Sequence, residues 1–326
     1  MKKIFTLIAA LAATASTFAQ HGNMTFAGKS VFYVSAGAAQ MGKTEVISDT
    51  VRYSGEDITL PQMKYNQMII PSFTIKGAQY TGGHDGVTWA DQTFTATAGE
   101  KQINGTSFSG TFTHTGGVYK LSIQATFNYG SMPMPITYTI ESYYVKSETK
   151  PVSVTVGGQF GPYTNDAVTY DARVYEEDGV KKMDVTMNEY NLNGTVMGDI
   201  SLGTYTVKGL IWDEEKGGYF RDYSKDDIKF RFKTSTGMDG EYTFKNGGAL
   251  LVVMDGASIK YAENTFQPGS MPFPIVATFG DKEASGIELP QTSADKSATV
   301  KKTIVNGRLV IERDGRKFNA SGIEIK

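Results

Sequence analysis

The sequence contains no cysteine. Disulfide bonds, thiolate metal sites and thiol nucleophiles are therefore excluded, and the folded chain must be stabilised by its hydrophobic cores. Histidine, the usual acid–base side chain near neutral pH, is also scarce, since only His21, His84 and His114 occur. Neither sign of charge dominates, because 32 basic and 34 acidic residues give a formal net charge of −2. Without a basic stripe, neither nucleic acid nor an anionic membrane surface is an expected partner.

Long apolar runs and helical periodicity are missing after the N-terminal segment. No later run approaches the roughly 20 apolar residues that a transmembrane helix needs. Residues 1–19 have the plan of a secretory signal peptide, with two lysines, an apolar run at Ile4–Ala13 and small residues up to Ala19. We expect cleavage before Gln20, which would leave an exported, soluble chain.

A repeated stretch organises the rest of the chain. T-F-N-Y-G-S-M-P-M-P-I at 126–136 returns as T-F-Q-P-G-S-M-P-F-P-I at 265–275, with eight of eleven positions identical. F-T-I-K-G at 73–77 returns as Y-T-V-K-G at 205–209. We also match the pair Gly116–Gly117 with Gly247–Gly248. Three pairs in the same order indicate a unit written twice, and about 130 residues per copy suffice to bury a core.

Period-two alternation predicts β-strands in both copies. In Val118–Phe127 apolar residues fall on one face, while Lys120, Ser122, Gln124 and Thr126 fall on the other. Gly116–Gly117 is a favoured hairpin link to a partner strand at Phe108–His114. Further strands of the first copy are expected at 46–53, 58–65, 69–80 (one strand or two), 87–97 (a pair) and 135–141.

The second copy repeats this plan. Strands are expected at 167–175, 180–192, 200–212, 218–223, 228–233, 241–245, 249–254 and 273–279. Between its Gly–Gly pair and Thr265 this copy has 16 residues where the first copy has 8, which predicts a longer loop or an added hairpin at Asp255–Gly256. About eight short antiparallel strands per copy favour a meander closed into a barrel, because closure removes sheet edges; an open sandwich is the alternative.

These patterns divide the chain into a signal peptide at 1–19, a first barrel at 20–147, a second barrel at 148–284, a linker at 285–302 and a tail at 303–326. The linker is rich in Ser, Ala, Thr and Lys. In the tail, Gly307, Gly315 and Gly322 separate three expected short strands, and the piece is too small to bury a core of its own.

Both copies resemble the calycin-like β-barrel domain of exported proteins from gut-dwelling Gram-negative bacteria. The resemblance is carried by P-S-F-T-I-K-G at 71–77, by Q-T-F-T-A-T at 92–97 and by F-x-x-G-S-M-P-x-P-I in both copies. It implies an all-β fold of two tandem, antiparallel, eight-stranded, up-and-down barrels related to lipocalins, with no agreed biochemical activity. The early G-x-W signature of lipocalins is absent, since its nearest pieces, at 86–89 and 209–212, have the wrong spacing and place.

The tail resembles the short C-terminal sorting tail of type IX secretion substrates. The matching pattern is N-G-R-L-V-I-E-R-D-G-R-K-F-N-x-x-G at 306–322. The resemblance implies export machinery as a partner, and a location in the periplasm, at the outer-membrane surface or outside the cell.

No grouping with catalytic or metal-binding spacing is found, so we predict no catalytic residues, no metal and no cofactor. His84 and Asp85 share a loop, but the matching loop of the second copy holds Glu214 and Glu215, so the fold does not need histidine there. The acidic loops at 176–179, 213–215 and 226–227 lack the alternating spacing of a calcium loop. Nucleophile elbows, phosphate loops and dinucleotide fingerprints are also absent.

Six large side chains are candidates for a ligand site: Trp89, Met132, Met134, Trp212, Met271 and Phe273. The Met-Pro-x-Pro-Ile motif should lie at an edge, a bulge or a strand start, because two alternating prolines cannot both donate to a ladder. Its apolar residues would then plug one barrel end, or form an adaptable rim that grips a lipid or peptide. The two tryptophans could line a pocket or fill the cores.

The sequence therefore predicts a non-catalytic exported or cell-surface protein. Its barrel mouths or loops would bind an apolar small molecule, a glycan or a protein. The alternative is a structural or adhesive surface module without a ligand pocket. An enzyme that acts through carboxylates is the third reading, and a pair of inward carboxylates in one barrel would support it.

Overall fold

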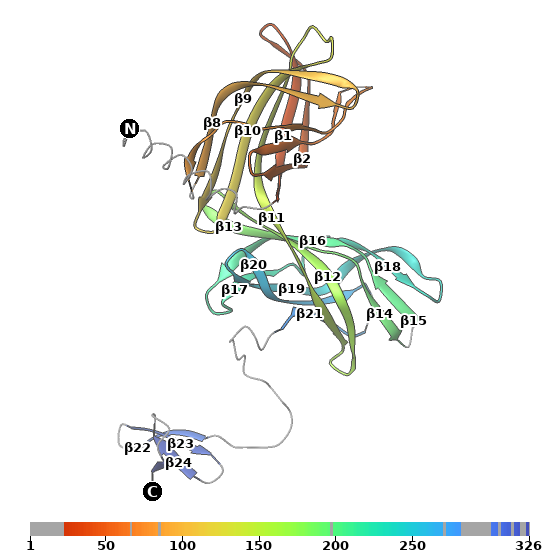
Figure 1. The fold of residues 1–326 in the computed structure, drawn as a ribbon. Coiled ribbons are helices and arrows are strands. Elements are labelled where there is room, and N and C mark those ends of the chain that lie inside the picture. The colour runs from red at the N-terminus through yellow and green to blue at the C-terminus, as the bar shows by residue number, and fades with distance from the viewer. Residues whose placement is uncertain are drawn as a thin grey trace. The chain divides into compact units, whose positions relative to one another are not determined.

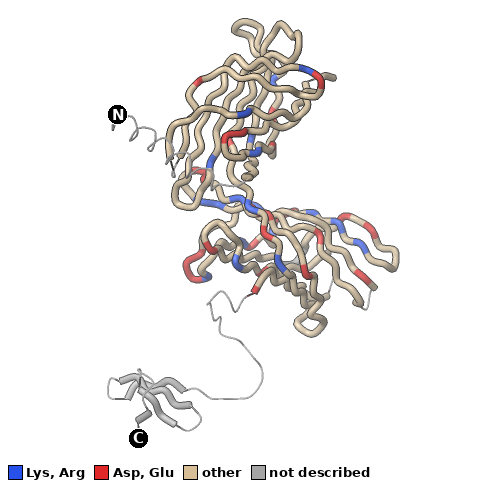
Figure 2. Tube along the Cα trace, in the orientation of Figure 1, with Lys and Arg blue, Asp and Glu red and all other residues tan. Residues whose placement is uncertain are grey.

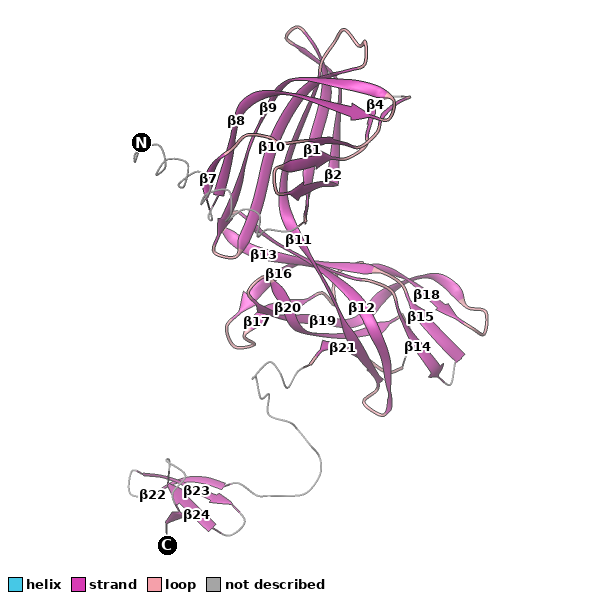
Figure 3. Ribbon diagram, in the orientation of Figure 1, coloured by secondary structure: helices cyan, strands magenta, loops and turns pink. Residues whose placement is uncertain are grey.

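The computed structural model describes residues 23–65, 67–83, 86–195, 198–269 and 272–281, and four strands within 301–325. The chain forms two compact units, residues 1–285 and 286–326. Every regular element in the described residues is a β-strand (Figure 3), as predicted. That part of the chain holds no helix long and apolar enough to cross a membrane. The predicted signal peptide, residues 285–300 of the predicted linker, His21, His84, Asp85 and Met271 lie outside the described residues, while residues 301 and 302 of that linker lie in a strand.

The first unit begins with barrel 1 (Figure 1). Its eight strands are β1 (Met24–Ala36), β2 (Ala39–Ser54), β3 (Asp57–Leu60), β6 (Phe73–Ile75), β8 (Gly86–Ala98), β9 (Lys101–Thr115), β10 (Val118–Tyr129) and the first half of β11 (Ile136–Val156). Antiparallel ladders run from β6 through β3, β2 and β1 to β11, and on through β10 and β9 to β8. The hairpin β4 (Met63–Tyr65) and β5 (Met68–Ile70) and the short β7 (Thr81–Gly83) are added to this barrel.

A side chain bridges the remaining seam of barrel 1, between β6 and β8. The Gln92 side chain accepts a hydrogen bond from the backbone N–H of Gln79 (2.9 Å) and donates one to the carbonyl oxygen of Gln79 (2.8 Å). These two side-chain hydrogen bonds take the place of the backbone hydrogen bonds that would pair the two strands. Because β8 pairs irregularly with β9 between Trp89 and Phe94, the Gln92 side chain is free to reach Gln79.

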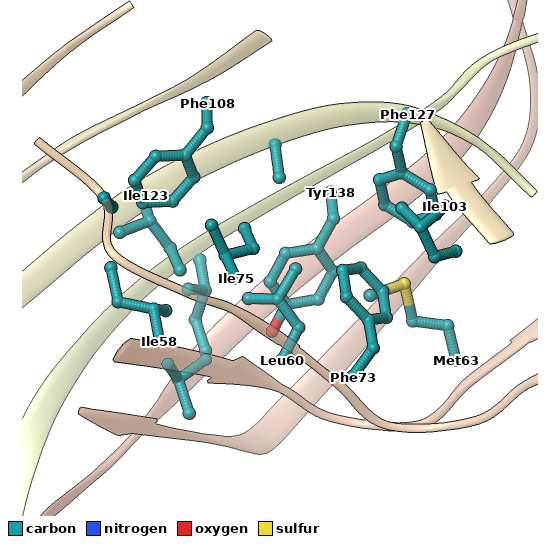
Figure 4. Packing of buried hydrophobic residues seen from close by; sticks show 14 of the residues in the cluster. Ile58, Leu60, Met63, Phe73, Ile75, Ile103, Phe108, Ile123, Phe127 and Tyr138 are labelled. Carbon is teal, nitrogen blue, oxygen red and sulfur yellow. The ribbon is translucent and has the colours of Figure 1, made fainter. Parts of the chain in front are cut away.

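The interior of barrel 1 is filled by side chains that alternate along its strands (Figure 4). On β10, Leu121, Ile123, Ala125 and Phe127 are buried, which confirms the face predicted for this strand. Aromatic rings interlock across the barrel, for example Phe73 with Phe127 at 5.1 Å between ring centroids. Such edge-to-face packing makes a dense core of large side chains.

Barrel 2 has a closed ring of eight strands. Its strands are the second half of β11, β12 (Phe160–Glu177), β13 (Val180–Met187), β16 (Tyr205–Asp213), β17 (Gly218–Asp222), β19 (Asp239–Asp255), β20 (Ser258–Pro268) and β21 (Ile275–Gly280). The ladders follow that order, and β21 returns to β11. The strands β14 (Tyr190–Thr195), β15 (Gly198–Leu202) and β18 (Lys229–Thr234) pair beside the ring, and β18 joins the first part of β19.

Strand β11 belongs to both barrels. It pairs with β1 and β10 up to Val145, and with β12 from Val145 onward. The boundary predicted at 147/148 therefore falls inside a continuous strand, and the sheet runs on from one barrel to the other. The buried hydrophobic residues nevertheless form two separate clusters, one in each barrel. Each copy thus has a core of its own, while the two copies share one strand.

The duplication extends to matching polar contacts. Gly77 after β6 and Gly209 in β16 both have left-handed backbone conformations, with φ of 60° and 69°. The N–H of Gly77 donates to Asp57 Oδ1 (3.1 Å), and the N–H of Gly209 donates to Asp184 Oδ1 (2.9 Å). The two K-G sequences are equivalent because each glycine is held by an aspartate of the neighbouring barrel strand, β3 in one copy and β13 in the other.

Hydroxyl pairs repeat in the same way. Thr59 Oγ1 lies 2.9 Å from Thr74 Oγ1 in barrel 1, and Thr186 Oγ1 lies 2.8 Å from Thr206 Oγ1 in barrel 2. These contacts confirm that β3 and β6 correspond to β13 and β16. The predicted match between the stretches at 73–77 and 205–209 is therefore correct.

The predicted match of Gly116–Gly117 with Gly247–Gly248 is wrong. Gly116 and Gly117 form the β9–β10 turn, but Gly248 lies within β19 and pairs with Phe266. The ring of Tyr223 packs where a Cβ of Gly248 would stand, at 2.3 Å, so this glycine makes room for a ring. The counterpart turn is at Gly256, between β19 and β20. The expected longer loop or added hairpin is therefore the ordinary β19–β20 hairpin.

Several strand divisions differ from the prediction. The pair expected at 87–97 is one strand, β8, and the two expected at 241–245 and 249–254 are one strand, β19. Each strand contains an irregular stretch where the sequence pattern breaks. The pairing of β8 with β9 shifts between Trp89 and Phe94, and that of β19 with β20 shifts between Phe244 and Gly248. Conversely, the stretches 58–65, 180–192 and 200–212 each divide into two strands, because the chain leaves the barrel there to form β4–β5 or β14–β15.

The second unit is a four-stranded antiparallel sheet. It consists of β22 (Lys301–Val305), β23 (Arg308–Arg313), β24 (Arg316–Asn319) and β25 (Glu324–Ile325). The sequence predicted three strands between glycines. The fourth precedes Gly307, so the three glycine positions separate four strands.

Candidate functional site

The barrel interiors hold core side chains. Trp89 is only 1% exposed, and its ring lies 5.7 Å from that of Tyr53 and 6.2 Å from that of Phe108. In barrel 2, Asn264 donates to the hydroxyl of Tyr205 and accepts from the hydroxyl of Tyr223, each at 2.6 Å. Such mutual pairing is how a buried amide is satisfied without a ligand.

The six predicted ligand residues do not converge on one site. Met132 and Met134 are half-buried against the core of barrel 1. Phe273 is 47% exposed and packs beside Phe160, with 6.2 Å between ring centroids. Trp212 is also 47% exposed, on barrel 2. With Trp89 in a core and Met271 outside the described residues, the structure does not gather this set.

A large concave surface lies instead on the outside of barrel 1. We name it the outer groove, and its volume is about 1000 Å³. Strand register defines its floor as rows of outward side chains across β8, β9, β10, β11 and β1. One row is Thr88, Thr111, Ser122, Glu141 and Lys29, and the next is Ser109, Gln124, Thr139 and Val31. The floor lies below the surrounding surface because most of these side chains are short and polar.

The β12–β13 hairpin forms one wall of the outer groove. Its residues Arg173, Tyr175, Glu176 and Glu177 line the groove. The hydroxyl of Tyr143 donates to the carbonyl oxygen of Glu176 at 3.3 Å. A smaller hollow of about 350 Å³ continues the groove along Tyr143 and Glu176 toward the β9–β10 turn.

Two cations fix this hairpin to barrel 1. Arg173 donates from Nη1 to the carbonyl oxygen of Ala27 (3.3 Å), and Lys181 donates from Nζ to the carbonyl oxygen of Gly116 (2.8 Å). Both acceptors are backbone atoms, so these contacts depend on the path of the chain and not on a matching side chain.

The base of the hairpin contains a buried ion pair. Arg173 Nη2 lies 2.6 Å from Asp184 Oδ2, and Asp184 is 7% exposed. The same carboxylate accepts from the Tyr175 hydroxyl (3.1 Å) and from the N–H of Gly209 (2.9 Å). Burial and the neighbouring Asp184 raise the pKa of Tyr175 to about 12. Asp184 is thus a satisfied structural carboxylate.

Charges of both signs border the outer groove, and Figure 2 shows them interspersed along the described chain. Lys120 and Glu141 form an ion pair at 2.9 Å. Burial opposes the charge on Lys120, but the bond to Glu141 prevails and its pKa lies above the ordinary value. Burial also raises the pKa of Tyr143, so its hydroxyl keeps its proton at neutral pH. The groove therefore offers hydroxyl, amide and balanced charged groups.

A second concave site is lined by rings. This aromatic pocket has a volume of about 230 Å³ and is lined by Tyr119, Tyr144, Trp212 and Tyr219. Two ring pairs are in contact, Tyr119 with Tyr144 and Trp212 with Tyr219, each with 5.6 Å between centroids. Lys146, Ala172, Val174, Met254 and the turns at 116–117 and 256–257 complete the lining.

Groups suited to catalysis or metal binding are not assembled in the described residues. There, no three His, Asp or Glu side chains are placed to hold a metal ion. Asp184 is the one carboxylate among the buried side chains of that part of the chain, and Arg173 pairs with it. The pair of inward carboxylates that would support an enzyme is therefore not found within these ranges.

Sequence reasoning missed the outer groove, and of the aromatic pocket it named only Trp212. The outward polar face of β10 was visible as the alternation of Lys120, Ser122 and Gln124. What the sequence could not show is the hairpin that walls this face, because its contacts go to backbone carbonyl groups.

Comparison with known proteins agrees with the architecture. The model of the calycin-like beta-barrel domain matches residues 17–141 and 149–282, one segment for each barrel. A solved structure of a protein from Bacteroides fragilis NCTC 9343, proposed to be an outer membrane protein, is 15% identical with a TM-score of 0.26, and the match covers 82% of this chain and 100% of that one. No curated protein matches the chain.

Proposed function

Because this chain belongs to the calycin-like beta-barrel domain family, we propose that it is a non-catalytic exported protein that binds a glycan in the outer groove of barrel 1. The observation that carries the proposal is the row pattern of the groove floor. Four neighbouring strands, β8 to β11, present Ser, Thr and Gln side chains to one concave surface of about 1000 Å³, and β1 adds Lys29 and Val31. This volume is at the upper end of ordinary ligand sites, so it suits a chain of several sugars.

The groove lining is mixed, because Val31 and the exposed Ile47 add apolar surface beside the floor hydroxyl groups and the Gln124 amide, and a sugar chain has both kinds of surface. An apolar molecule would bury the floor hydroxyl groups and the Gln124 amide without partners, which costs about 1–3 kcal/mol for each group. A glycan can exchange hydrogen bonds with the same groups. Tyr143 and Tyr175 add rings at the wall, with 6.0 Å between their centroids. Tyrosine offers both an apolar face and a hydroxyl, which suits the two kinds of surface on a sugar.

Binding in the groove is tested by a matched pair of arginine substitutions. The mature chain is titrated calorimetrically with soluble polysaccharides that a glycan array selects. Gln124 is exposed at the centre of the floor, so Gln124→Arg places a long side chain in the groove. Thr97→Arg puts the same side chain on exposed β8 outside the groove. We expect Gln124→Arg to weaken binding by about tenfold or more, equal to about 1.4 kcal/mol, with Thr97→Arg unchanged.

Equal affinities for the two variants would refute the groove as the site. Binding of peptides but not of glycans would refute the ligand class. Robust hydrolysis of a bound polysaccharide by the purified chain would contradict the non-catalytic role.

Export is part of the proposal, and it is supported by sequence patterns at both ends. The segment 1–19 would direct the chain to the secretion machinery, and the tail at 303–326 would act as a sorting signal for passage to the cell surface. Deletion of residues 303–326 should leave both barrels folded but retain the protein in the periplasm. Unchanged surface delivery of the truncated chain would refute the role of the tail.

A structural or adhesive role without a small-molecule pocket is the second candidate. Dense packing in the described interior of both barrels favours it, since Trp89 and the ring clusters occupy the positions where a lipocalin-type ligand would sit. It predicts that no glycan or small ligand raises the melting temperature of the mature chain.

A further inference from the structure

We infer that the aromatic pocket is a second binding site, and that it takes a single neutral sugar ring. The inference rests on the proposed function only in taking the ligand to be a sugar. The site itself is separate from the outer groove, and its lining includes none of the floor residues of that groove. Different variants therefore test the two sites.

The size of the pocket sets the size of the ligand. Its volume of about 230 Å³ is below the ~300–1,000 Å³ that is usual for sites of drug-sized ligands. One six-membered ring with its substituents fits such a space, while a chain of sugars does not. The turns at 116–117 and 256–257 border the pocket, and their glycines present backbone groups without side chains. A Cβ on Gly117 or Gly256 would meet no atom within 4 Å, so the space beside both turns is open.

The polar groups of the rings, which are the tyrosine hydroxyls and the indole N–H of Trp212, also favour a sugar. The rings of Tyr119, Tyr144 and Tyr219 are half-buried, so each of them combines an apolar face with a hydroxyl group that can bond to a ligand. Burial raises the pKa of Tyr144 and of Tyr219, so both hydroxyls remain donors at neutral pH. Four lining residues that each combine a ring with a hydrogen-bond donor suit a ligand with several hydroxyl groups.

Two other ligand classes fit less well. A quaternary ammonium ion is the usual guest of an aromatic cage, but the Lys146 side chain lines this pocket and, although it pairs with Glu148 at 3.4 Å, it would place a second cation beside the ligand. A purely apolar ring would stack on Trp212 yet leave the tyrosine hydroxyls buried and unpaired, which is unfavourable. A sugar ring has an apolar C–H face for the aromatic rings and equatorial hydroxyls for their polar groups.

Adjacent residues of β16 provide a matched pair for the test. Trp212 is 47% exposed and lines the pocket, while Ile211 is 51% exposed and does not. Neither belongs to a buried core, so Trp212→Ala and Ile211→Ala should both fold. Thermal unfolding of the two variants verifies this before binding is measured.

The measurement is ligand-observed NMR by saturation transfer, on the full mature chain with single monosaccharides. The panel contains neutral hexoses, N-acetylhexosamines and hexuronates, with choline and indole as probes of the rival classes. We expect saturation of a neutral sugar by the wild-type chain, at least a fivefold loss in Trp212→Ala, and no change in Ile211→Ala. Gln124→Arg should keep the full signal because it alters only the outer groove.

The outcomes separate the two sites. Equal saturation in Trp212→Ala and the wild type, or no saturation by any sugar, would overturn the inference while leaving polysaccharide binding in the groove to stand on its own test. Stronger saturation of choline or indole than of every sugar would overturn the ligand class. Loss of the monosaccharide signal in Gln124→Arg would show one site in place of two.

Discussion

The carboxylate of Asp184 and the backbone N–H of Gly209 are joined by a hydrogen bond of 2.9 Å, and Asp57 and Gly77 form the same bond in the other copy at 3.1 Å. The surroundings of the two aspartates differ. Asp184 also pairs with Arg173 and is 7% exposed, whereas Asp57 forms no ion pair with any described residue and is half-buried. The duplicated contact thus allows an ion pair to be compared with a simple hydrogen bond in one molecule.

Removing each carboxylate should give unequal losses of stability. Asp184→Ala leaves the guanidinium of Arg173 and two further donors without their acceptor, so we expect the free energy of unfolding to fall by about 3 kcal/mol. Asp57→Ala removes one hydrogen bond and should cost about 1 kcal/mol. Urea unfolding monitored by fluorescence can separate the barrels, because the two tryptophans, Trp89 and Trp212, lie in different copies. Equal losses would contradict a stabilising role for the ion pair.

The paired glycines make a second matched test. An alanine at either position must adopt a left-handed backbone, at a cost of about 1–2 kcal/mol. At Gly77 a Cβ would meet no atom within 4 Å, but at Gly209 it would lie 2.9 Å from Nη1 of Arg221. Gly209→Ala should therefore destabilise the protein more than Gly77→Ala in the same unfolding experiment. Equal losses, or a larger loss in Gly77→Ala, would show that the Arg221 side chain moves aside at little cost.

Gln92 is expected to control local opening of barrel 1. Gln92→Ala removes both bonds to the backbone of Gln79, which should lower the free energy of opening at the β6–β8 seam by about 1–2 kcal/mol. Hydrogen exchange at the Gln79 amide measures this directly. Gln102→Ala, which removes an exposed side chain from β9, is the control and should leave that exchange rate unchanged. Similar exchange in both variants would mean that the bridge does not hold the seam.

Alkaline pH should unfold the protein through its tyrosines. Burial raises the pKa of Tyr175 to about 12 from an ordinary 10, and it raises those of Tyr138, Tyr170, Tyr223 and Tyr261 further. Since the folded chain then binds more protons than the unfolded chain above pH ~10, stability is complete below that pH and falls as pH rises. Tyrosinate absorbance should therefore rise together with the loss of secondary structure. Smooth titration of all tyrosines in a folded chain would contradict this expectation.

The sequence predicted some strands well because their environment is simple. β10 separates a buried face from a solvent face along its length, so alternation alone locates it. Gly248 was wrongly aligned with a turn glycine of the first copy. The sequence alone does not distinguish a glycine that makes room for the Tyr223 ring from a glycine in a turn. Similarly, nothing local distinguishes Trp89 in a core from Trp212 at a pocket. Their exposures are set by strands distant in the sequence.

The continuous path of β11 also has a mechanical meaning. Tension between the two barrels would load this strand along its axis, in shear against antiparallel neighbours on both sides. Many ladder bonds would have to break together before the strand could slide, unlike the sequential rupture of a hairpin pulled open from its end. The junction between the two barrels should therefore resist mechanical force, whereas a flexible linker at the same position would extend first.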